Sequence, residues 1–307
     1  MVERLVANEK VEGSTPFARS IRNKIKIKIM IIWIASYPKS GNTYVRSFLS
    51  SYYYSKKGTF DFELLLNIKQ FPAFRYSSKK AYTYLDAASN WIPNQNSFFK
   101  KDENCFLKTH NSLEEYFGKK FTTSAETAGG IYIVRDPRNI ISSLCNHYAI
   151  DLDKAYTKMT DHNSSLSLKL ADEDYSNFTF LGTWSNHYWS WKNNMNFKTL
   201  IIRYEDLRDN THEEFRKILN FIENLKGSNN IINEEKLTNS INSTNFSKLK
   251  NKEKMYGFGE STVSKDGKPI NFFNLGFRNK WEELLPKKMS DKIRDEFNNE
   301  LKDLKYE

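Results

Sequence analysis

Cysteine is scarce in this chain, with only Cys105 and Cys145 among 307 residues. Two cysteines without metal-type spacing form neither a disulfide framework nor a structural zinc site, so we expect a reducing compartment, most simply the cytoplasm. Long hydrophobic runs are also lacking. The apolar stretch at residues 25–35 is short and contains Lys26 and Lys28. We therefore expect no membrane span.

Aromatic residues, by contrast, are plentiful: 22 Phe, 17 Tyr and 6 Trp supply ample core material. A chain of this length with 39% hydrophobic residues can fold as one large α/β domain or two small ones. The formal charge of +10 suggests nucleic-acid binding, but the lysines are scattered among Asn and Glu rather than grouped in one block. A basic solvated surface explains the charge as well, and we expect no nucleic-acid partner.

Residues 1–29 carry seven Lys or Arg and three Glu, so they account for +4 of the net charge and leave +6 for the rest. They contain neither a useful amphipathic helix nor a secretory pattern. One codon choice for the Gly-Ser-Thr-Pro at residues 13–16, GGTTCGACTCCC, resembles the T-arm of a tRNA gene. We expect the native protein to begin at Met30, with residues 1–29 a non-native or disordered extension and 30–307 the folded domain. Recovery of Met1 by N-terminal sequencing would contradict this.

The stretch IIWIASYPKSGNTYVRSFL, residues 31–49, has the pattern of a strand, a tight loop and a helix. A loop that leads into a helix N-terminus presents free backbone N–H groups and the positive end of the helix dipole, which suit an anion such as phosphate or sulfate. Gly41 permits close approach, and Lys39 adds a mobile charge. The loop is not a Walker A sequence, because its Lys precedes the only Gly. A plain Pro-Gly turn with an incidental Lys is the alternative.

Two further segments end in polar residues where a buried strand stops. The segment NCFLKTH, residues 104–110, indicates one such strand, and GGIYIVRDPRNIISSLCNHY, residues 129–148, indicates a strand, a charged turn and a helix with Pro137 in its first turn. Arg135 and Ser143 are eight positions apart, so both can reach one ligand. The alternative is that Arg135 pairs with Asp136 or caps a neighbouring element.

The remaining pattern favours a parallel sheet covered by helices on both faces. Residues 180–194 indicate an aromatic helix, and residues 198–210 a strand followed by a polar turn. The segment Thr-His-Glu-Glu at residues 211–214 fits a capping box for a helix that runs through Leu225. Residues 226–266 suggest short helices and loops over the active face, and the last helix is expected near Ser290.

Taken together, the motifs resemble those of sulfotransferases that use 3′-phosphoadenosine-5′-phosphosulfate (PAPS). SYPKSGNTYVRS looks like the family's 5′-phosphosulfate loop and VRDPRNIISS like its 3′-phosphate segment, in the family's order. LKTH, RYEDL and TNFSKLK resemble its catalytic strand end and the two segments that contact adenine. The match extends from about residue 31 to 281, with a weak middle at residues 55–101. The resemblance implies a single α/β domain of the P-loop-containing nucleoside triphosphate hydrolase type.

The family's roles carry over to the matching positions of this chain. His110 would be the general base, Lys39 would contact the bridging oxygen of the donor, and Lys108 would stabilise the sulfuryl oxygens. The resemblance implies PAPS as co-substrate, no metal, and a hydroxyl (or amine) of a small molecule or glycan as acceptor. The implied nucleotide-binding residues are Lys39, Ser40, Gly41, Asn42, Thr43, Tyr44, Arg135, Ser143, Tyr204, Phe246, Asn274, Gly276 and Arg278.

One departure from the family lies near the C-terminus. The family has a Phe-Arg-Lys-Gly segment, whereas FNLGFRNKW, residues 273–281, places Asn274 and Leu275 where two cations bind the 3′-phosphate. Arg278 or Lys268 could replace them. A nucleotide-binding protein without catalysis is therefore one alternative, and a basic nucleic-acid-binding protein is a second.

The other histidines are interpreted as surface or packing residues, because no metal-ligand spacing links them. They are His147, His162, His187 and His212. His187 is the next candidate base after His110. The acceptor cleft is expected to form from residues 52–100 and 226–266, whose aromatic residues suit a phenol, an apolar alcohol or a sugar ring.

Overall fold

A central sheet of five parallel strands organises the molecule, in the order β2-β3-β1-β4-β7. The computed structural model describes residues 30–307 except 97–104, 168–172, 229 and 265, so our expectation for residues 1–29 lies outside the described residues. The strands are β1 (Ile31–Ser36), β2 (Lys69–Gln70), β3 (Cys105–Thr109), β4 (Thr127–Val134) and β7 (Lys198–Arg203). The predicted parallel sheet is confirmed. Strand β2 was not predicted, because two residues carry no periodic signal.

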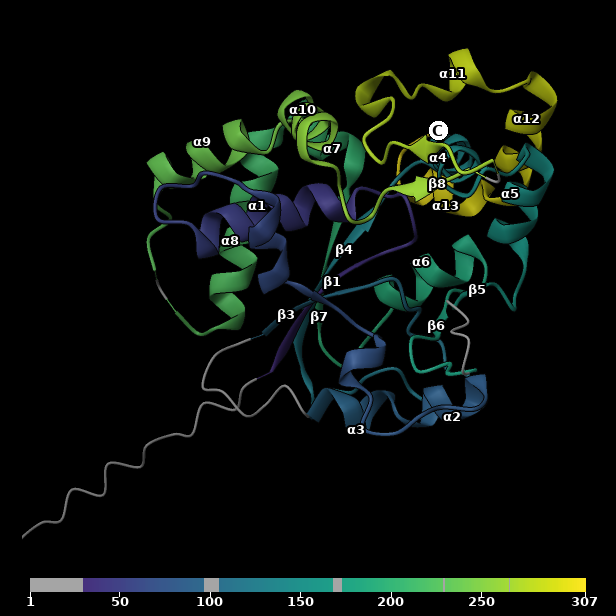
Figure 1. Cartoon of the computed structure of the whole chain (residues 1–307), viewed down its shortest axis with the longest axis horizontal. Helices are drawn as coiled ribbons and strands as arrows, with labels where there is room; N and C mark the ends of the chain where they lie inside the picture. The colour runs from purple at the N-terminus through teal and green to yellow at the C-terminus, as the bar shows by residue number, and fades with distance from the viewer. Residues whose placement is uncertain (1–29, 97–104, 168–172, 229, 265) are drawn as a thin grey trace, which may run out of the picture.

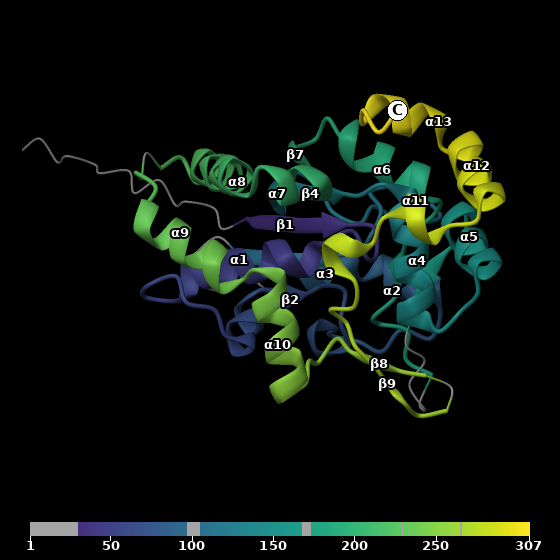
Figure 2. The same ribbon diagram turned by 90° about the horizontal axis from the view of Figure 1, so that it is seen from above.

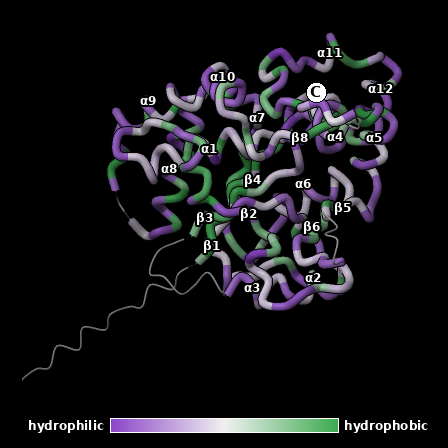
Figure 3. Tube along the Cα trace, in the orientation of Figure 1, coloured by the Kyte–Doolittle hydropathy of each residue, from purple (hydrophilic) through white to green (hydrophobic). Residues whose placement is uncertain are grey.

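Strand β1 is buried on both faces, which explains its unbroken apolar sequence. Ile32 and Ile34 point into one hydrophobic core, while Ile31, Trp33 and Ala35 belong to the other. Figure 3 shows the same pattern, with the hydrophobic part of the chain concentrated at the central strands. Successive side chains of a strand alternate between faces, so one apolar run supplies both cores.

Helices cover both faces of the sheet, as expected, and Figures 1 and 2 show the two layers from orthogonal directions. One core joins the strands to α1 (Asn42–Tyr54), α8 (Thr211–Leu225) and α9 (Glu234–Ser243). The other core is formed with α2 (Tyr84–Ser89), α3 (Trp91–Gln95), α4 (Pro137–Tyr148), α5 (Leu152–Thr160), α6 (Trp184–Lys192), α12 (Lys287–Glu296) and α13 (Asn298–Asp303). None of the helices within the described residues is both long and apolar enough to cross a bilayer.

The remaining elements are short and lie mainly near the carboxyl ends of the strands. They are α7 (Tyr204–Asp209), α10 (Phe246–Tyr256), α11 (Trp281–Leu284), the hairpins β5 (Ser165–Leu166) with β6 (Thr179–Phe180) and β8 (Thr262–Val263) with β9 (Pro269–Ile270), and 3-10 helices at Phe62–Asn67, Phe74–Tyr76 and Gly276–Arg278. The prediction of short helices and loops at residues 226–266 is confirmed.

Three local predictions are wrong. The residues after β7 form helix α7 rather than a polar turn. Asn210, not Thr211, is the N-cap of α8, and no capping box forms because the Thr211 hydroxyl donates to the carbonyl of Leu207 in α7. The C-terminal helix begins at Lys287 and is interrupted at Phe297, so two helices replace the one expected near Ser290.

Candidate active site

The carboxyl ends of β1, β3, β4 and β7 meet at one edge of the sheet, where the structure has a cavity of about 410 Å³. Parallel strands place their polar C-terminal residues together, so motifs far apart in sequence converge here. Most of the predicted site residues line this cavity: Lys39, Gly41, Asn42, Thr43, Tyr44, Lys108, His110, Arg135, Ser143, Tyr204, Phe246, Asn274 and Gly276. Ser40 is buried beneath it, and neither Arg278 nor Lys268, both exposed, is among the lining residues.

The loop between β1 and α1 has the conformation that an anion site requires. Lys39 and Gly41 both adopt left-handed backbone angles, with φ of 67° and 101°. A Cβ at Gly41 would lie 2.3 Å from Cδ2 of Tyr204, so only glycine fits. The side-chain amide of Asn42 donates to the carbonyl of Ile34 and braces the end of β1. A helix leaves the N–H groups of its first turn without acceptors inside the helix, and Asn42 and Thr43 of the first turn of α1 line the cavity.

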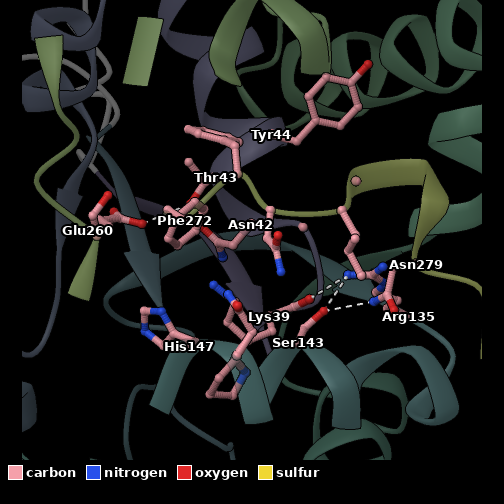
Figure 4. Close-up of a pocket in the computed structure, with 18 of the residues that line it drawn as sticks. Lys39, Asn42, Thr43, Tyr44, Arg135, Ser143, His147, Glu260, Phe272 and Asn279 are labelled. Atoms are coloured by element: carbon pink, nitrogen blue, oxygen red, sulfur yellow. Dashed lines mark hydrogen bonds between the residues drawn. The ribbon is translucent and has the colours of Figure 1, made fainter. Parts of the chain in front are cut away.

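Lys39 is held within the cavity rather than in solvent. Its ammonium lies 3.7 Å from the centroid of the Phe272 ring, a cation–π contact that Figure 4 displays. Burial lowers the pKa of Lys39 to about 7, and the charges of Lys108 and Arg135 act in the same direction, partly opposed by Glu260. An anion in the cavity would restore the full charge of this lysine.

His110 follows β3, and its ring is oriented by the neighbouring strand. Its Nδ1 lies 2.7 Å from the carbonyl oxygen of Ser36. A carbonyl oxygen only accepts, so Nδ1 carries the proton and Nε2 has a free lone pair. Burial lowers the pKa of His110 to about 3, and the charge of Lys108 adds to this effect. The ring is therefore neutral at cellular pH.

His187 is a buried residue whose two ring nitrogens are both hydrogen-bonded. It is fully buried in α6, its Nε2–H donates to the carbonyl of His110 at 3.0 Å, and its Nδ1 accepts from the hydroxyl of Tyr132 at 2.9 Å. Both ring nitrogens are occupied, so our interpretation of His187 as the next candidate base is wrong. Its hydrogen bond fixes the backbone that carries His110.

The other histidines differ in position. His162 and His212 are exposed. His147 lines the cavity and packs edge-on against Phe272, so the packing interpretation holds although the site was not anticipated. Burial and the nearby charge of Lys39 lower the pKa of His147 to about 4.

The side chain of Arg135 contacts the loop between β1 and α1. Its guanidinium donates to the carbonyl of Lys39 at 3.2 Å and to the hydroxyl of Ser143 at 3.4 Å (Figure 4). It also lies 4.6 Å from the centroid of the Tyr204 ring. The alternative pairing with Asp136 is wrong, because that carboxylate binds Arg138 instead.

An aromatic slot adjoins these cations. Phe246 packs so closely on Gly276 that a Cβ there would lie 2.5 Å from the ring. Phe277 lies between the rings of Tyr204 and Phe246, with centroids 6.5 and 6.1 Å away. The side chain of Tyr44 stands apart from Lys39 in Figure 4 and packs edge-on against a core ring. A planar base would fit among such rings.

The cavity residues that the sequence analysis did not single out include Glu260, Phe272, Phe277 and Asn279. Asn279 donates to the Ser143 hydroxyl at 2.9 Å and to the carbonyl of Asn139, while its own oxygen accepts from Ser142. No local pattern marks these residues, because they enter the site from loops after α10 whose paths only the tertiary structure defines.

The predicted acceptor cleft is only partly correct. Among the described residues of 52–100, Gln70 alone lines the cavity. Several buried residues of that region, including Phe71 and Trp91, pack into the hydrophobic core. Tyr148 and Leu166 contribute to the cavity wall instead.

Comparisons with known proteins place the fold and the family. The structure is similar to that of retinol dehydratase in complex with retinol and PAP, at 18% identity and a TM-score of 0.55, covering 89% of this chain and 81% of the other. It also matches a mouse sulfotransferase complexed with PAP, at 15% identity and a TM-score of 0.47, covering 89% and 84%. A search of curated proteins returns no significant match. The sequence model described as "Sulfotransferase domain" matches residues 31–305, nearly the whole chain, and the protein therefore belongs to the sulfotransferase family.

Proposed function

We propose that this protein transfers the sulfuryl group of PAPS to a hydroxyl (or amine) of a small molecule or glycan, with His110 as general base. One observation carries the proposal. The free Nε2 of a neutral, oriented imidazole shares a single cavity with the loop between β1 and α1, the buried Lys108 and the half-buried Lys39. Such a transfer needs a base for the proton of the acceptor, a site that binds the anionic donor, and cations near the transferred group.

In this proposal the 5′ end of the nucleotide lies on the loop of residues 39–44, with Ser40 buried beneath it. The 3′-phosphate binds Arg135 and Ser143. The adenine occupies the aromatic slot, which Asn274 and Gly276 border, and Asn274 and Leu275 take the place of the family's two cations. With Arg278 and Lys268 exposed away from the cavity lining, Arg135 carries most of the 3′-phosphate charge.

The transfer proceeds in line. The acceptor oxygen forms a bond to sulfur while the bond from sulfur to the bridging oxygen of the 5′-phosphate breaks, and the electron pair of that bond stays on adenosine 3′,5′-bisphosphate (PAP). The proton of the acceptor passes to Nε2 of His110. Lys39 stabilises the charge that grows on the bridging oxygen, and Lys108 contacts the sulfuryl oxygens.

The low pKa of His110 applies to the protein with no anion bound in the cavity. The negative charges of the donor would oppose the effect of Lys108 and raise the pKa of the imidazole toward the range in which a general base works best. The base form is nevertheless fully populated at neutral pH before the donor arrives. Donor binding therefore improves the base without having to create it.

Aromatic and apolar side chains in the cavity favour an acceptor with a flat or apolar body. Tyr148, Leu166 and Phe272 are among the lining residues. The solved retinol dehydratase binds retinol, an apolar alcohol, which makes alcohols a sensible first set of acceptors to test. Two free cysteines are consistent with our expectation of a cytoplasmic protein.

Two substitutions test the assignment of roles. His110→Ala should lower turnover by at least ~10²-fold and leave nucleotide affinity nearly unchanged, because the base acts on the acceptor. Lys39→Ala should also lower turnover, but by loss of charge stabilisation in the transition state.

The pH dependence of turnover separates the two variants. The acidic limb, set by His110, should persist in Lys39→Ala and vanish from the remaining activity of His110→Ala. Wild-type turnover with an intact acidic limb in His110→Ala would contradict the proposal.

A further inference from the structure

The segment between α10 and the 3-10 helix at Gly276–Arg278, residues 257–273, contributes a carboxylate to the centre of the cavity. Glu260 Oε2 accepts from the Thr43 hydroxyl at 2.9 Å. Its other oxygen, Oε1, accepts from Arg46 at 2.6 Å and from Lys108 Nζ at 3.0 Å. Arg46 and Lys108 are each 5% exposed, so these are desolvated, charge-assisted contacts. A carboxylate with three donors is bound in the way an external oxyanion would be.

The same segment also engages the second lysine of the site. Phe272, near its C-terminal end, lies under the ammonium of Lys39 at 3.7 Å. In Figure 4 the side chains of Glu260, Phe272 and Thr43 are drawn near one another, with Lys39 below Phe272 in the view. Both lysines that we assign to sulfuryl transfer, Lys39 and Lys108, are thus held by internal partners.

This arrangement is anchored rather than incidental. The carboxylate of Glu253, buried in α10, accepts from the backbone N–H of Phe272 at 2.6 Å and of Phe273 at 2.9 Å, and also from the hydroxyl of Ser261. One side chain therefore ties both ends of the segment to the helix. The hydroxyl of Thr262 adds a bond to the carbonyl of His147 on α4.

Glu260 does not have the properties of a second general base. Burial alone would raise the pKa of its carboxyl, but the charges of Lys108 and Arg46 outweigh that effect and hold the pKa well below its usual range. A carboxylate this weakly basic accepts a proton poorly at neutral pH. Its chemistry is that of a bound anion.

We propose that Glu260 is an internal anion that competes with the sulfuryl end of the donor for Lys108 and Thr43. The inference rests on the proposed function. Two anions cannot share these donors without strong repulsion in a buried site, so donor binding must displace the carboxylate from them. Arg46 is not among the residues that line the cavity and can keep Glu260 after it withdraws.

This competition lowers the affinity of the site for the donor, PAPS, relative to its affinity for the product, PAP. PAPS presents sulfuryl oxygens to Lys108, whereas PAP lacks them. Once the sulfuryl group has left with the acceptor, Glu260 can bind Lys108 again while PAP is still in the pocket. Glu260 thus determines how strongly the pocket distinguishes PAPS, which carries a sulfuryl group, from PAP, which does not.

Binding measurements on Glu260→Gln test this, with Asp266→Asn as the matched control. Asp266 is exposed between β8 and β9, in the same segment as Glu260, so its variant removes one negative charge without touching the cavity. Glu260→Gln should bind PAPS about tenfold more tightly than the wild type, as expected for removal of a charged hydrogen-bond competitor. PAP affinity should change less than PAPS affinity, and Asp266→Asn should match the wild type. Unchanged or weaker PAPS binding by Glu260→Gln would overturn the inference.

Folding of the variant provides a second readout. Without the carboxylate, Arg46 and Lys108 lose their counter-ion, so Glu260→Gln should melt at a lower temperature than the wild type. Inorganic sulfate should raise the melting temperature of Glu260→Gln more than that of the wild type, compared with sodium chloride at matched ionic strength. Glu260→Asp keeps the charge and shortens the reach. It should retain the fold and gain part of the PAPS affinity. Equal effects of sulfate on wild type, Glu260→Gln and Asp266→Asn would count against an internal anion.

The two readouts separate this inference from the proposed function. If the wild type and Glu260→Gln both fail to bind PAPS while sulfate selectively stabilises Glu260→Gln, the proposed donor is wrong and the internal anion stands. If PAPS binds the wild type and all variants equally, the donor is right and the competition is refuted.

Discussion

Lys39 makes nucleotide binding depend on pH in a way that can be worked out from the structure. Burial lowers its pKa to about 7, with Lys108 and Arg135 adding to the shift. At pH 8 a lysine with this pKa is only about one-tenth protonated in the empty cavity. The phosphate charges of PAP favour the ammonium form and raise the pKa again. Binding at pH 8 should therefore take up about 0.9 proton.

The sign of the effect on affinity follows from the same shift. The bound state holds more protons than the free state above pH 7, so PAP affinity should fall as pH rises, by up to about tenfold per unit until the pKa of the bound state is reached. The phosphates of PAP, with a second pKa of about 6, are fully ionised at pH 8 and take up no proton there. His110 and His147, with pKa values of about 3 and about 4, are also neutral in the free protein.

Calorimetry measures this uptake directly. PAP is titrated at pH 8 in two buffers whose ionisation enthalpies differ, and the difference in observed enthalpy gives the number of protons taken up. Lys39→Met removes the titrating group and should abolish the uptake, whereas Lys268→Met, at an exposed position, should not. Equal enthalpies in both buffers for the wild type, or uptake that persists in Lys39→Met, would refute the reasoning.

Three further predictions concern specificity and stability. Arg135→Ala should remove the preference for PAP over adenosine 5′-monophosphate in calorimetry, at a cost of roughly 1.5–3 kcal/mol; a preference that survives would contradict the 3′-phosphate assignment. Gly41→Ala should lower the free energy of unfolding in urea by about 1–3 kcal/mol, because its Cβ meets Tyr204, and by more than Gly227→Ala, which has φ of +64° but open space around it. His187→Phe should destabilise the fold more than Tyr132→Phe in the same assay. The first change leaves the Tyr132 hydroxyl and the His110 carbonyl unsatisfied and the second leaves only one ring nitrogen of His187, each buried group costing about 1–3 kcal/mol. Equal losses of stability would argue against two hydrogen bonds.

The sequence was most informative where local chemistry and local structure coincide. The unbroken apolar run of β1 and the glycine at the start of α1 predict a strand, a loop and a helix, because each depends on residues that are neighbours in the chain. The convergence of Lys39, His110 and Arg135 follows from parallel strands that end at one edge. These parts needed no knowledge of the folded molecule.

Contacts set by tertiary packing were not predictable in the same way. The capping-box pattern at residues 211–214 looks convincing, yet the preceding residues fold into α7 and take the Thr211 hydroxyl. Glu260 lies 217 positions after Thr43 and meets it through a loop whose course the pattern of residues does not specify. The aromatic residues of 52–100 looked like an acceptor cleft, but an aromatic side chain fits a core equally well, and Phe60, Phe71 and Trp91 are buried in cores.

Transfer of a labelled sulfuryl group tests the central claim most directly. Purified protein is incubated with PAPS that carries the label on sulfur, together with pools of alcohols, phenols and sugars, and both PAP and labelled acceptor are quantified. The account predicts that label moves to at least one acceptor pool in equal amount to the PAP formed, and that His110→Ala, while still binding PAP, transfers at least ~10²-fold more slowly. If the wild type binds PAPS but forms neither PAP nor labelled product with any pool, the chain is a nucleotide-binding protein without sulfotransferase activity and the account is wrong.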